Sequence, residues 1–532
     1  MQGKGTSEEK KVDRRTYLKI AGGTIAGLVV GGVLGYVLKP AGERILTTTV
    51  KEIATTTVKE TVTVTKTQTV TATVSPTPTV TVTPPTPTRP KPAVPTTIDY
   101  LIWTWAVEFQ YGIVDRWNKI RGKEYPVRIN ELPQETYFEG AESRLITGVP
   151  TDVMFSDVYL QIIGYYNDWI IAVEDYFPEI RQYLTEFPEG YRPGLLVKNK
   201  MMGLHKYGAP TLFLYNEDYL RKAGIDEPPK TWEEVAEQAT KIKERGIADR
   251  PCGAFFGSYG FWQTLYSFIA GFARSPDEIP MFDKEANPLF AHEDHPLFKA
   301  LRFIVKAINI DKTWDPLSVT QGEPEDIMAL GGGSWAFGWM PAYDFASIND
   351  PSQKAYPHIK QTLNPGSKYT SCWIRPINIT TMCAKRGKDA LQGAYEFMIY
   401  YSGKVNPETL EPDFKNGIYL VQKEAVIKVG DWTAISEVWT YPDVQEKVRK
   451  FADPKMLMEQ DKYLFLHQMD PDPYVAPYWA KWSGGFGSGP ARAELEALML
   501  GQRGTSDNDI MNSLKTIEKL WLTMKKEHET KH

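Results

Sequence analysis

The sequence predicts an α/β protein whose folded part follows a membrane segment and a stalk. Three observations predict this organisation: strand-like and helix-like segments alternate from residue 98 onward, residues 20–38 carry no charge, and Thr and Pro dominate residues 47–97. Because strands that alternate with helices usually pair in parallel, we expect a largely parallel sheet that helices cover on both faces.

The composition is that of a folded protein with an acidic main part. The 532 residues are 42% hydrophobic and 12% aromatic, which is enough to bury a sizeable core. Residues 1–97 carry 13 basic and 6 acidic side chains, for a net charge of +7, and residues 98–532 carry 48 and 60, for −12. An acidic body without a basic stripe argues against a nucleic-acid partner.

The N-terminal segment predicts an anchor. Arg14 and Arg15 precede an uncharged, Gly-rich run of nineteen residues, 20–38, that Lys39 closes. At 1.5 Å per residue a helix of this length spans roughly 28 Å, close to the hydrocarbon core of a bilayer. The paired arginines resemble a twin-arginine export signal, and an ordinary signal-anchor is the alternative. With no clear cleavage site, we expect residues 1–39 to remain in the cytoplasmic membrane and the rest to lie at the cell surface.

Residues 40–97 are expected to form a stalk. From residue 47 to residue 97, 21 of 51 residues are Thr and 8 are Pro. This composition cannot bury a core, and its Pro-rich end favours extended polyproline geometry.

The folded part opens with alternating elements. Short apolar segments predict strands, and periodic segments between them predict helices. In chain order we expect a strand at 100–104, a helix at 111–120, a strand at 127–130, a helix at 133–146 and a strand at 152–155.

Later helices are predicted by caps and by apolar spacing. Thr231 and Glu234 form a capping box, and apolar residues at 3-4-3 spacing follow it up to Ile242, before Gly246. The same periodicity predicts helices at 390–401, 492–500 and 510–524.

One stretch resembles a known family. Residues 201–235 read MMGLHKYGAPTLFLYNEDYLRKAGIDEPPKTWEEV, and their order and spacing resemble the family 1 extracellular solute-binding proteins, the maltose-binding-protein-like receptors of ATP-driven importers. Residues 332–339, 377–403 and 475–500 resemble the family more weakly. The resemblance implies a two-lobed, periplasmic-binding-protein-like (type II) fold whose lobes are discontinuous in sequence. Lobe 1 would hold residues 98–208 and 371–428, and lobe 2 residues 209–370 and 429–532.

The resemblance also implies the function. We expect an extracytoplasmic substrate-binding protein that takes a carbohydrate in the interlobe cleft and delivers it to ABC permease subunits, with the ATPase on a separate chain. No G-x-S-x-G, H-E-x-x-H or Walker motif is present, and we expect no enzyme activity, no cofactor and a monomeric binding module. Three alternatives stay open: a tethered glycoside hydrolase, a receptor for a non-sugar solute such as a peptide, and a structural surface protein.

Candidate ligand residues are aromatic side chains and carboxylates, because sugar rings offer both C–H faces and hydroxyls. For lobe 1 and the first crossing strand, the expected residues are Trp105, Glu108, Asp157, Tyr159, Tyr207 and Thr211. Helix capping by Glu108 or Asp157, and hinge packing of Tyr207 and Thr211, are the competing interpretations.

The remaining candidates come from lobe 2 and the later loops. They are Tyr259, Trp262, Trp339, Tyr343, Trp373, Tyr478, Trp479 and Trp482. Trp339 resembles the family's ligand-stacking aromatic most closely, and a place in the core of its lobe is its competing interpretation. Dense aromatics in the last loop could equally pack between the lobes.

Two further patterns have plain explanations. His292 and His295 flank two carboxylates, but Asp294 before Pro296 more simply caps a helix, so we expect no metal site. Cys372 and Cys383 are expected on neighbouring strands, where a disulfide could form.

Overall fold

The computed structural model describes residues 92, 94–104, 106–484 and 489–530. Residues 87–532 form one compact unit. The predicted anchor at 1–39 lies outside the described residues, as does most of the stalk. Within the described ranges, no helix combines the length and the apolar character that crossing a bilayer requires.

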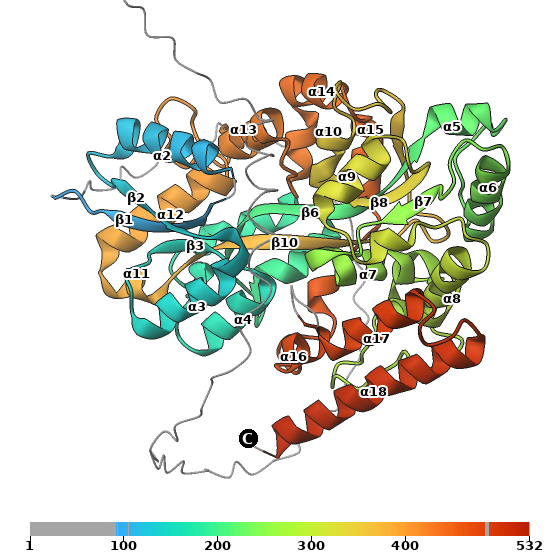
Figure 1. The fold of residues 1–532 in the computed structure, drawn as a ribbon. Helices are drawn as coiled ribbons and strands as arrows, with labels where there is room; N and C mark the ends of the chain where they lie inside the picture. Colours follow the sequence, from blue (N-terminus) through green and yellow to red (C-terminus); the bar gives the residue numbers. More distant parts are fainter. Residues whose placement is uncertain (1–91, 93, 105, 485–488, 531–532) are drawn as a thin grey trace, which may run out of the picture. The chain divides into compact units, whose positions relative to one another are not determined.

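Nine strands of the described chain form one sheet, in the order β2-β1-β3-β10-β6-β8-β7, with β11 beside β10 and β9 beside β6 (Figure 1). Their bounds are β1 Ile98–Trp103, β2 Val127–Leu132, β3 Val153–Phe155, β6 Gly203–Asn216, β7 Cys252–Ala254, β8 Phe337–Pro341, β9 Ile359–Thr362, β10 Thr370–Ile379 and β11 Leu464–Leu466. A separate hairpin holds β4 (Leu196–Val197) and β5 (Lys200–Met201).

Strand directions divide the sheet. β1 is parallel to β2 and β3, and β7 is parallel to β8, as predicted. The prediction of a largely parallel sheet is wrong for the two longest strands, because β6 is antiparallel to both β10 and β8. β6 and β10 carry the chain across the sheet in opposite directions, so they pair antiparallel.

β6 belongs to both halves of the sheet. Its first part, up to Pro210, pairs with β10, and its second part, from Thr211, pairs with β8 and β9. In Figure 1, β6 and β10 run from the elements around β1–β3 to those around β7 and β8. We call these halves lobe 1 and lobe 2; the predicted lobe boundary after residue 208 falls inside β6.

Helices cover both halves. The lobe 1 helices are α2 Val107–Arg121, α3 Tyr137–Thr147, α4 Val158–Tyr166, α11 Thr381–Lys385, α12 Lys388–Ser402 and α13 Leu420–Val429. The lobe 2 helices are α5 Glu217–Lys222, α6 Trp232–Glu244, α7 Phe261–Phe272, α8 Pro296–Asn309, α9 Glu323–Gly331, α10 Phe345–Ile348, α16 Trp479–Ser483, α17 Pro490–Met499 and α18 Asp507–Glu529. Two further helices are α14 Pro442–Val448, which contacts α13, and α15 Pro454–Gln460.

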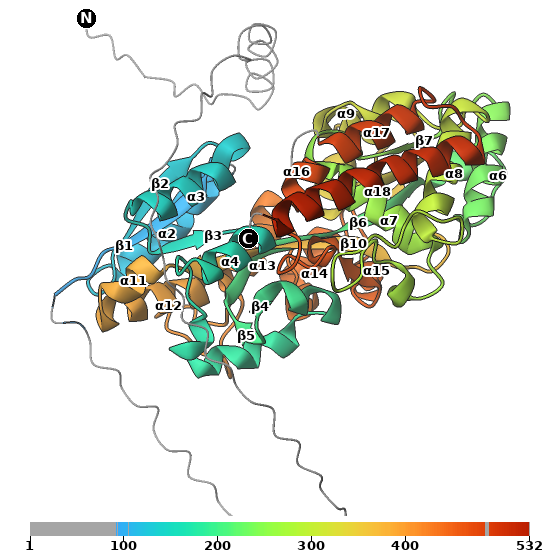
Figure 2. The same ribbon diagram turned by 90° about the horizontal axis from the view of Figure 1, so that it is seen from below.

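The predicted caps and apolar stripes build the core. Thr231 Oγ1 accepts a hydrogen bond from the Glu234 amide at 3.2 Å, which completes the capping box of α6. The apolar face of α18, from Ile510 to Trp521, is buried. Figure 2 shows α18 beside α17 and α8, and the three helices are in contact.

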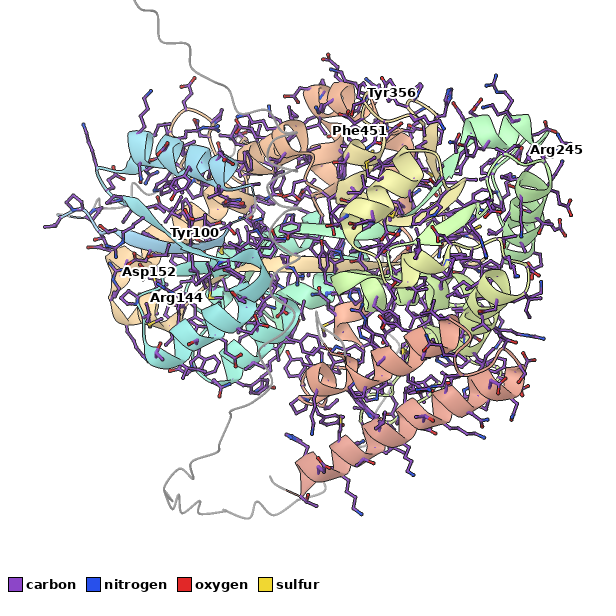
Figure 3. All side chains as sticks on the ribbon, in the orientation of Figure 1. Tyr100, Arg144, Asp152, Arg245, Tyr356 and Phe451 are labelled. Atoms are coloured by element: carbon purple, nitrogen blue, oxygen red, sulfur yellow. The ribbon has the colours of Figure 1, made fainter. Side chains whose placement is uncertain are left out.

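Polar contacts at the start of β3 and a ring contact of β1 join the strands and helices of lobe 1. The Asp152 carboxylate, labelled in Figure 3, accepts a hydrogen bond from the Asp99 amide at 2.8 Å and forms an ion pair with Arg386. Tyr100, also labelled, packs its ring edge-on against Phe397 of α12 at 5.1 Å. These contacts fix β1 and β3 against the helices of this lobe.

Two local expectations are wrong. The N-cap of α8 is His295 rather than Asp294: its Nδ1 accepts from the Leu297 amide at 3.1 Å. Cys383 lies on the helix α11 rather than on a strand beside Cys372, and all three cysteines are free.

Candidate functional site

The crossing strands present a row of large side chains on one face. Arg375 of β10 pairs directly with Tyr207 of β6, and Trp373 pairs with Ala209. Side chains two residues apart on a strand point to the same face, so Trp373, Arg375 and Tyr207 lie together. They form the centre of what we call the interlobe cluster: Trp103, Phe138, Tyr207, Tyr343, Trp373 and Arg375.

Rings from both lobes meet in this cluster. The Tyr207 ring lies 5.0 Å from Trp373 and 6.0 Å from Trp103 of β1, measured between centroids. Tyr343, in the 3₁₀ turn η9 (Ala342–Asp344) of lobe 2, lies 5.9 Å from Trp373. Trp373 therefore contacts aromatic residues of both lobes.

The cluster lies where parallel strands end. Trp103 ends β1, Phe138 lies in the first turn of α3 after β2, and Asp157 follows β3. In lobe 2, Tyr343 follows β8, and Tyr259 lies in the turn η6 (Ser258–Gly260) after β7. Open α/β sheets bind ligands at the carboxyl ends of their strands, and here both lobes direct those ends to the crossing strands.

Arg375 places a positive charge between aromatic faces. Its guanidinium carbon lies 4.9 Å from the Phe138 centroid and 5.0 Å from the Trp373 centroid. Burial raises the pKa of Tyr207, and the Arg375 charge and its hydrogen bond to Tyr207 oppose that rise. Burial also raises the pKa of Asp157, which the charge of Arg375 again opposes.

A bulge brings a second cation to the same place. The register shifts between Arg375 and Pro376, so that Lys206 is an extra residue of β6. Its Nζ lies 4.3 Å from the Tyr207 centroid and 5.1 Å from that of Trp103. Burial lowers the pKa of Lys206, and the buried Asp431 carboxylate opposes that change. The Asp431 carboxylate therefore compensates the positive charge of Lys206.

Two buried donors of the cluster, Trp103 Nε1 and Trp373 Nε1, have no hydrogen-bond partner among the described residues. The Tyr159 hydroxyl, on which the charges of Asp470 and Asp157 act, also has none. Because buried polar groups are normally paired, such donors indicate a place where a polar ligand completes the hydrogen bonding.

Lobe 2 contributes carboxyl groups. The Tyr259 hydroxyl donates to Glu323 Oε2 at 2.5 Å and lies 3.5 Å from the Tyr343 hydroxyl. Asp344, the residue after Tyr343, is buried, and burial followed by the Glu323 charge raises its pKa well above the usual range. We call Glu323 and Asp344 the carboxyl pair.

The structure gives several predicted residues other roles or no site contact. Asp157 is the N-cap of α4 and accepts from the Leu160 amide at 2.6 Å, as its competing interpretation held, while it also lies in the field of Arg375. Thr211 is buried at the hinge, where its Oγ1 accepts from Gln263 Nε2 at 3.1 Å. Glu108 is exposed in the first turn of α2, and Trp105 lies outside the described residues.

The prediction for Trp339 is wrong. The side chain is fully buried in lobe 2, stacked on Phe213 at 4.5 Å and on Trp314 at 5.4 Å, and its Nε1 donates to Asn364. A ring enclosed on both faces cannot stack on a ligand. Trp482 is wrong for the same reason: it is fully buried, and its Nε1 donates to the Ile517 carbonyl at 2.8 Å.

Three more predicted aromatics pack inside lobe 2. Trp262 donates from Nε1 to the Ser483 carbonyl and lies 5.2 Å from Trp479. Tyr478 lies 4.6 Å from Trp521 of α18. Their ring contacts are with one another and with the core of this lobe, so they join α7, α16 and α18 rather than the interlobe cluster.

The sequence patterns did not indicate Arg375, Lys206, Phe138 or the carboxyl pair as ligand residues. Arg375 could have been predicted from the sequence, because it lies two residues after Trp373 on the same strand and its side chain therefore points to the same face of the sheet. The bulge that redirects Lys206 has no local signal, and Glu323 reaches Asp344 only through tertiary packing, in which α9 contacts α10, the helix that follows η9.

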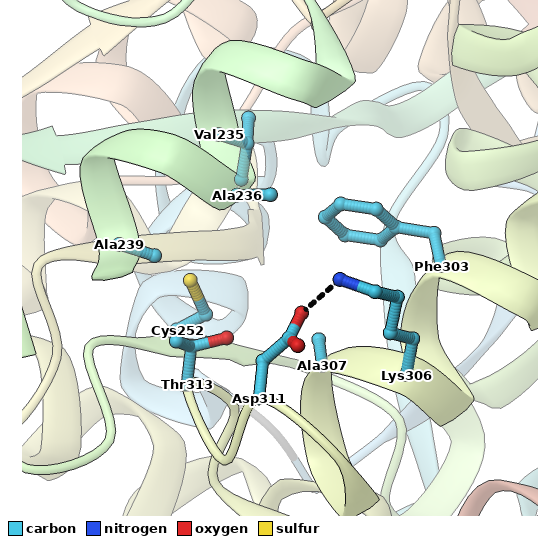
Figure 4. A pocket seen from close by; sticks show the side chains of 9 residues that line it. All are labelled: Val235, Ala236, Ala239, Cys252, Phe303, Lys306, Ala307, Asp311 and Thr313. Atoms are coloured by element: carbon cyan, nitrogen blue, oxygen red, sulfur yellow. Dashed lines mark hydrogen bonds and ion pairs between the residues drawn. The ribbon is translucent and has the colours of Figure 1, made fainter. Parts of the chain in front are cut away.

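Two cavities lie elsewhere. One, between α6 and α8, measures about 30 Å³ and is crossed by the Lys306–Asp311 ion pair (Figure 4); it has room for about one water molecule. The other measures about 340 Å³ and is lined by residues of both lobes, including Pro193, Phe282 and Asp470.

Comparison with known proteins agrees with this architecture. The model of the family described as bacterial extracellular solute-binding protein matches residues 103–404, more than half of the chain. The maltose-bound MalE3 of T. maritima aligns with a TM-score of 0.60 at 18% identity, over 80% of this chain and 99% of that chain. The sugar-binding protein MalE of Xanthomonas citri aligns with a TM-score of 0.63 at 16% identity, over 82% and 99%. These two structures establish the two-lobed α/β fold.

Sequence relatives match shorter stretches. An amino-acid ABC transporter periplasmic-binding protein of Sinorhizobium fredii is 28% identical over 195 residues, 36% of this chain and 42% of its own length. The sn-glycerol-3-phosphate-binding protein UgpB of Brucella abortus is 37% identical over 87 residues, 15% of this chain and 19% of its own length. The chain therefore spans less than half of these relatives. Since the family match includes both crossing strands, the chain belongs to the bacterial extracellular solute-binding proteins.

Proposed function

We propose that this protein is the extracytoplasmic receptor of an ABC importer and that it binds a carbohydrate between its lobes. The observation that carries the proposal is the interlobe cluster, in which Trp373 joins aromatic residues of lobe 1 and lobe 2 on the strands that connect them. A ligand held there would contact both lobes and would favour their closure.

The chemistry of the cluster suits a sugar. Aromatic rings pack against the C–H face of a pyranose, and the unpartnered donors of Trp103, Tyr159 and Trp373 can bind its oxygens. The carboxyl groups of Asp157, Glu323 and Asp344 can accept hydrogen bonds from its hydroxyls. Trp105, Glu108 and Thr211 stay candidate ligand residues.

The relatives support a range of solutes. The T. maritima structure is described as maltose-bound, and that of a solute-binding protein of Agrobacterium vitis as holding D-mannitol. The sequence relatives carry the names of amino-acid and sn-glycerol-3-phosphate binders. The aromatic content of the interlobe cluster favours the carbohydrate.

We propose further that residues 1–39 anchor the protein in the cytoplasmic membrane and that the Thr- and Pro-rich stalk extends it from the surface. Permease subunits with a separate ATPase would then receive the solute. Solute exchange at a membrane surface needs only that the receptor stay within reach of its permease, which a tether ensures.

Isothermal titration of the full chain against malto-, cello- and chito-oligosaccharides tests the proposal. We expect one sugar to bind with a 1:1 stoichiometry and to be recovered unchanged. Tight binding of a peptide and of no sugar would overturn the carbohydrate assignment. Release of shorter sugars, abolished by substitution of an acidic residue, would favour the hydrolase instead.

A further inference from the structure

The carboxyl pair of lobe 2 is the least compensated group at the proposed site. Glu323 Oε1 and Asp344 Oδ2 are buried and accept from no donor among the described residues, and the two carboxyl groups can hydrogen-bond to each other only when one of them is protonated. Asp344 is only 6% exposed. Neither carboxyl forms an ion pair with a Lys, Arg or His side chain in the described part of the chain, in contrast to Asp431, which faces Lys206.

Two buried carboxyl groups that face each other need a proton or a cation between them, because desolvated like charges are strongly unfavourable. Burial and the neighbouring Glu323 raise the pKa of Asp344, which favours a proton on the carboxyl pair. The other titratable groups that act on this place are Asp326 of α9, Tyr259 of η6 and Tyr343 of η9. All of them are acids, and none can neutralise the pair.

We propose that the carboxyl pair binds a positively charged amino group of the transported solute, which replaces the proton. The inference rests on the proposed function and specifies its substrate class as an amine-bearing solute. An ammonium group offers three donors and a full charge, enough for Glu323 Oε1 and Asp344 Oδ2 together. The rings of Tyr259 and Tyr343 beside the pair add aromatic faces that favour a cation.

A metal ion fits less well. The Tyr259 hydroxyl already donates to Glu323 Oε2, and Ca²⁺ requires six or more oxygen ligands. The described residues gather no group of three or more His, Cys, Asp or Glu side chains that could hold a metal. A neutral hydroxyl supplies one donor and leaves the negative charge uncompensated.

The test compares matched probes by titration calorimetry with the full chain. Chitosan tetramer carries amino groups, N-acetylchitotetraose is its neutral twin, and L-lysine is an amine that is not a sugar. We expect the amine to bind at least tenfold more tightly than its neutral twin, since a buried charge partner contributes about this much or more. Titrations in two buffers of different ionisation enthalpy report the protons exchanged on binding. Once the ionisation of the amine itself is subtracted, binding of the amine should displace a proton from the protein that binding of the neutral twin does not displace.

The variants assign the effect. Glu323→Gln and Asp344→Asn should each reduce the affinity for the amine about tenfold more than they reduce the affinity for the neutral probe. Glu325→Gln, an exposed carboxylate on the same helix, is the matched control and should change neither affinity. Thermal melts of each variant show that the loss is not a folding defect, and Glu323→Gln serves if Asp344→Asn does not fold.

The outcomes separate the two proposals. Equal affinities for both tetramers, or an amine preference that survives both substitutions, would overturn this inference and leave the carbohydrate receptor standing. Binding of L-lysine alone, sensitive to Glu323→Gln, would support the amine site and overturn the carbohydrate assignment. Failure of every probe to bind would overturn both.

Discussion

Arg375 and Trp373 define the chemistry of the proposed site at the scale of single residues. The guanidinium lies over the Trp373 ring at 5.0 Å, and the same ring contacts Tyr207 and Tyr343. A planar cation stacked on a ring keeps its in-plane donors available for oxygen atoms. Trp373 therefore orients Arg375 and also offers the surface on which a sugar would lie.

Trp373→Ala should weaken sugar binding by about 1–3 kcal/mol, because it removes the central ring of the interlobe cluster. Titration calorimetry with the sugar that binds best measures the change. Trp262→Ala, a comparable change within lobe 2, is the control and should leave the affinity of the folded protein unchanged. An unaltered affinity in folded Trp373→Ala would remove this residue from the site.

Trp339→Ala should act on stability rather than on binding. The ring is buried among Phe213, Phe268 and Trp314, so truncation leaves a cavity and costs about 3–5 kcal/mol of unfolding free energy. Urea denaturation followed by fluorescence measures the loss. If stability were unchanged while sugar affinity fell, the ring would belong to the site after all.

At the scale of elements, the crossing strands approach each other closely. A Cβ added at Gly208 of β6 would lie 2.8 Å from the Trp373 carbonyl oxygen and 3.3 Å from the Tyr191 ring. The first of these neighbours is backbone of β10 and cannot turn away. Glycine at this position thus sets the spacing of the two strands that hold Tyr207 and Arg375.

Gly208→Ala should separate β6 from β10 locally. Overpacking of this kind costs about 1–3 kcal/mol of stability, and the shifted strands should also weaken sugar binding. Thermal unfolding and titration of the same sample measure both effects. Gly112→Ala, at a helix position with nothing within 4 Å of the added carbon, is the control. If Gly208→Ala kept the stability and the sugar affinity of the wild type, the spacing of β6 and β10 would not depend on this glycine.

At the scale of the whole molecule, a buried acid lies where the lobes meet. Asp470 Oδ2 accepts from the Tyr266 hydroxyl at 2.7 Å and from the Met281 amide at 2.6 Å, and its charge acts on Tyr159 of lobe 1. Burial raises the pKa of Asp470 to about 7. The folded protein therefore binds a proton here that the unfolded chain has already lost above pH 4.

The raised pKa of Asp470 makes the stability of the fold depend on pH in a definite direction. Between pH 4 and pH 7 the folded state binds more protons at Asp470 than the unfolded state, so the contribution of this residue to stability falls as the pH rises. Asp470→Asn keeps an oxygen that can accept from Tyr266 and Met281 but does not titrate. Its unfolding free energy should decline less over this window than that of the wild type, as urea denaturation at pH 4.5, 6 and 7.5 measures. Parallel pH profiles of the two proteins would contradict the assignment.

The sequence by itself determined most of the local structure. The capping box of Thr231 and Glu234, the buried stripe of α18 and the first strands follow from spacing and side-chain chemistry, which act within a few residues. The stretch at residues 201–235 also indicated the two-lobed fold, because it contains a crossing strand. Tyr207 and Trp373 are candidates because they lie at the two expected crossings between the lobes, and Tyr343 because its turn resembles the ligand-stacking turn of the family.

Only the tertiary structure decided which aromatic and acidic side chains meet. Trp339 and Trp373 both lie on strands beside a lobe boundary, but α6, α7 and the segment before η8 (Pro316–Val319) cover the first, while the second faces lobe 1. Glu323 and Asp344 are 21 residues apart and become a pair through the packing of α9. Burial and charge compensation depend on neighbours distant in sequence, and those are set by how the elements pack rather than by any local pattern.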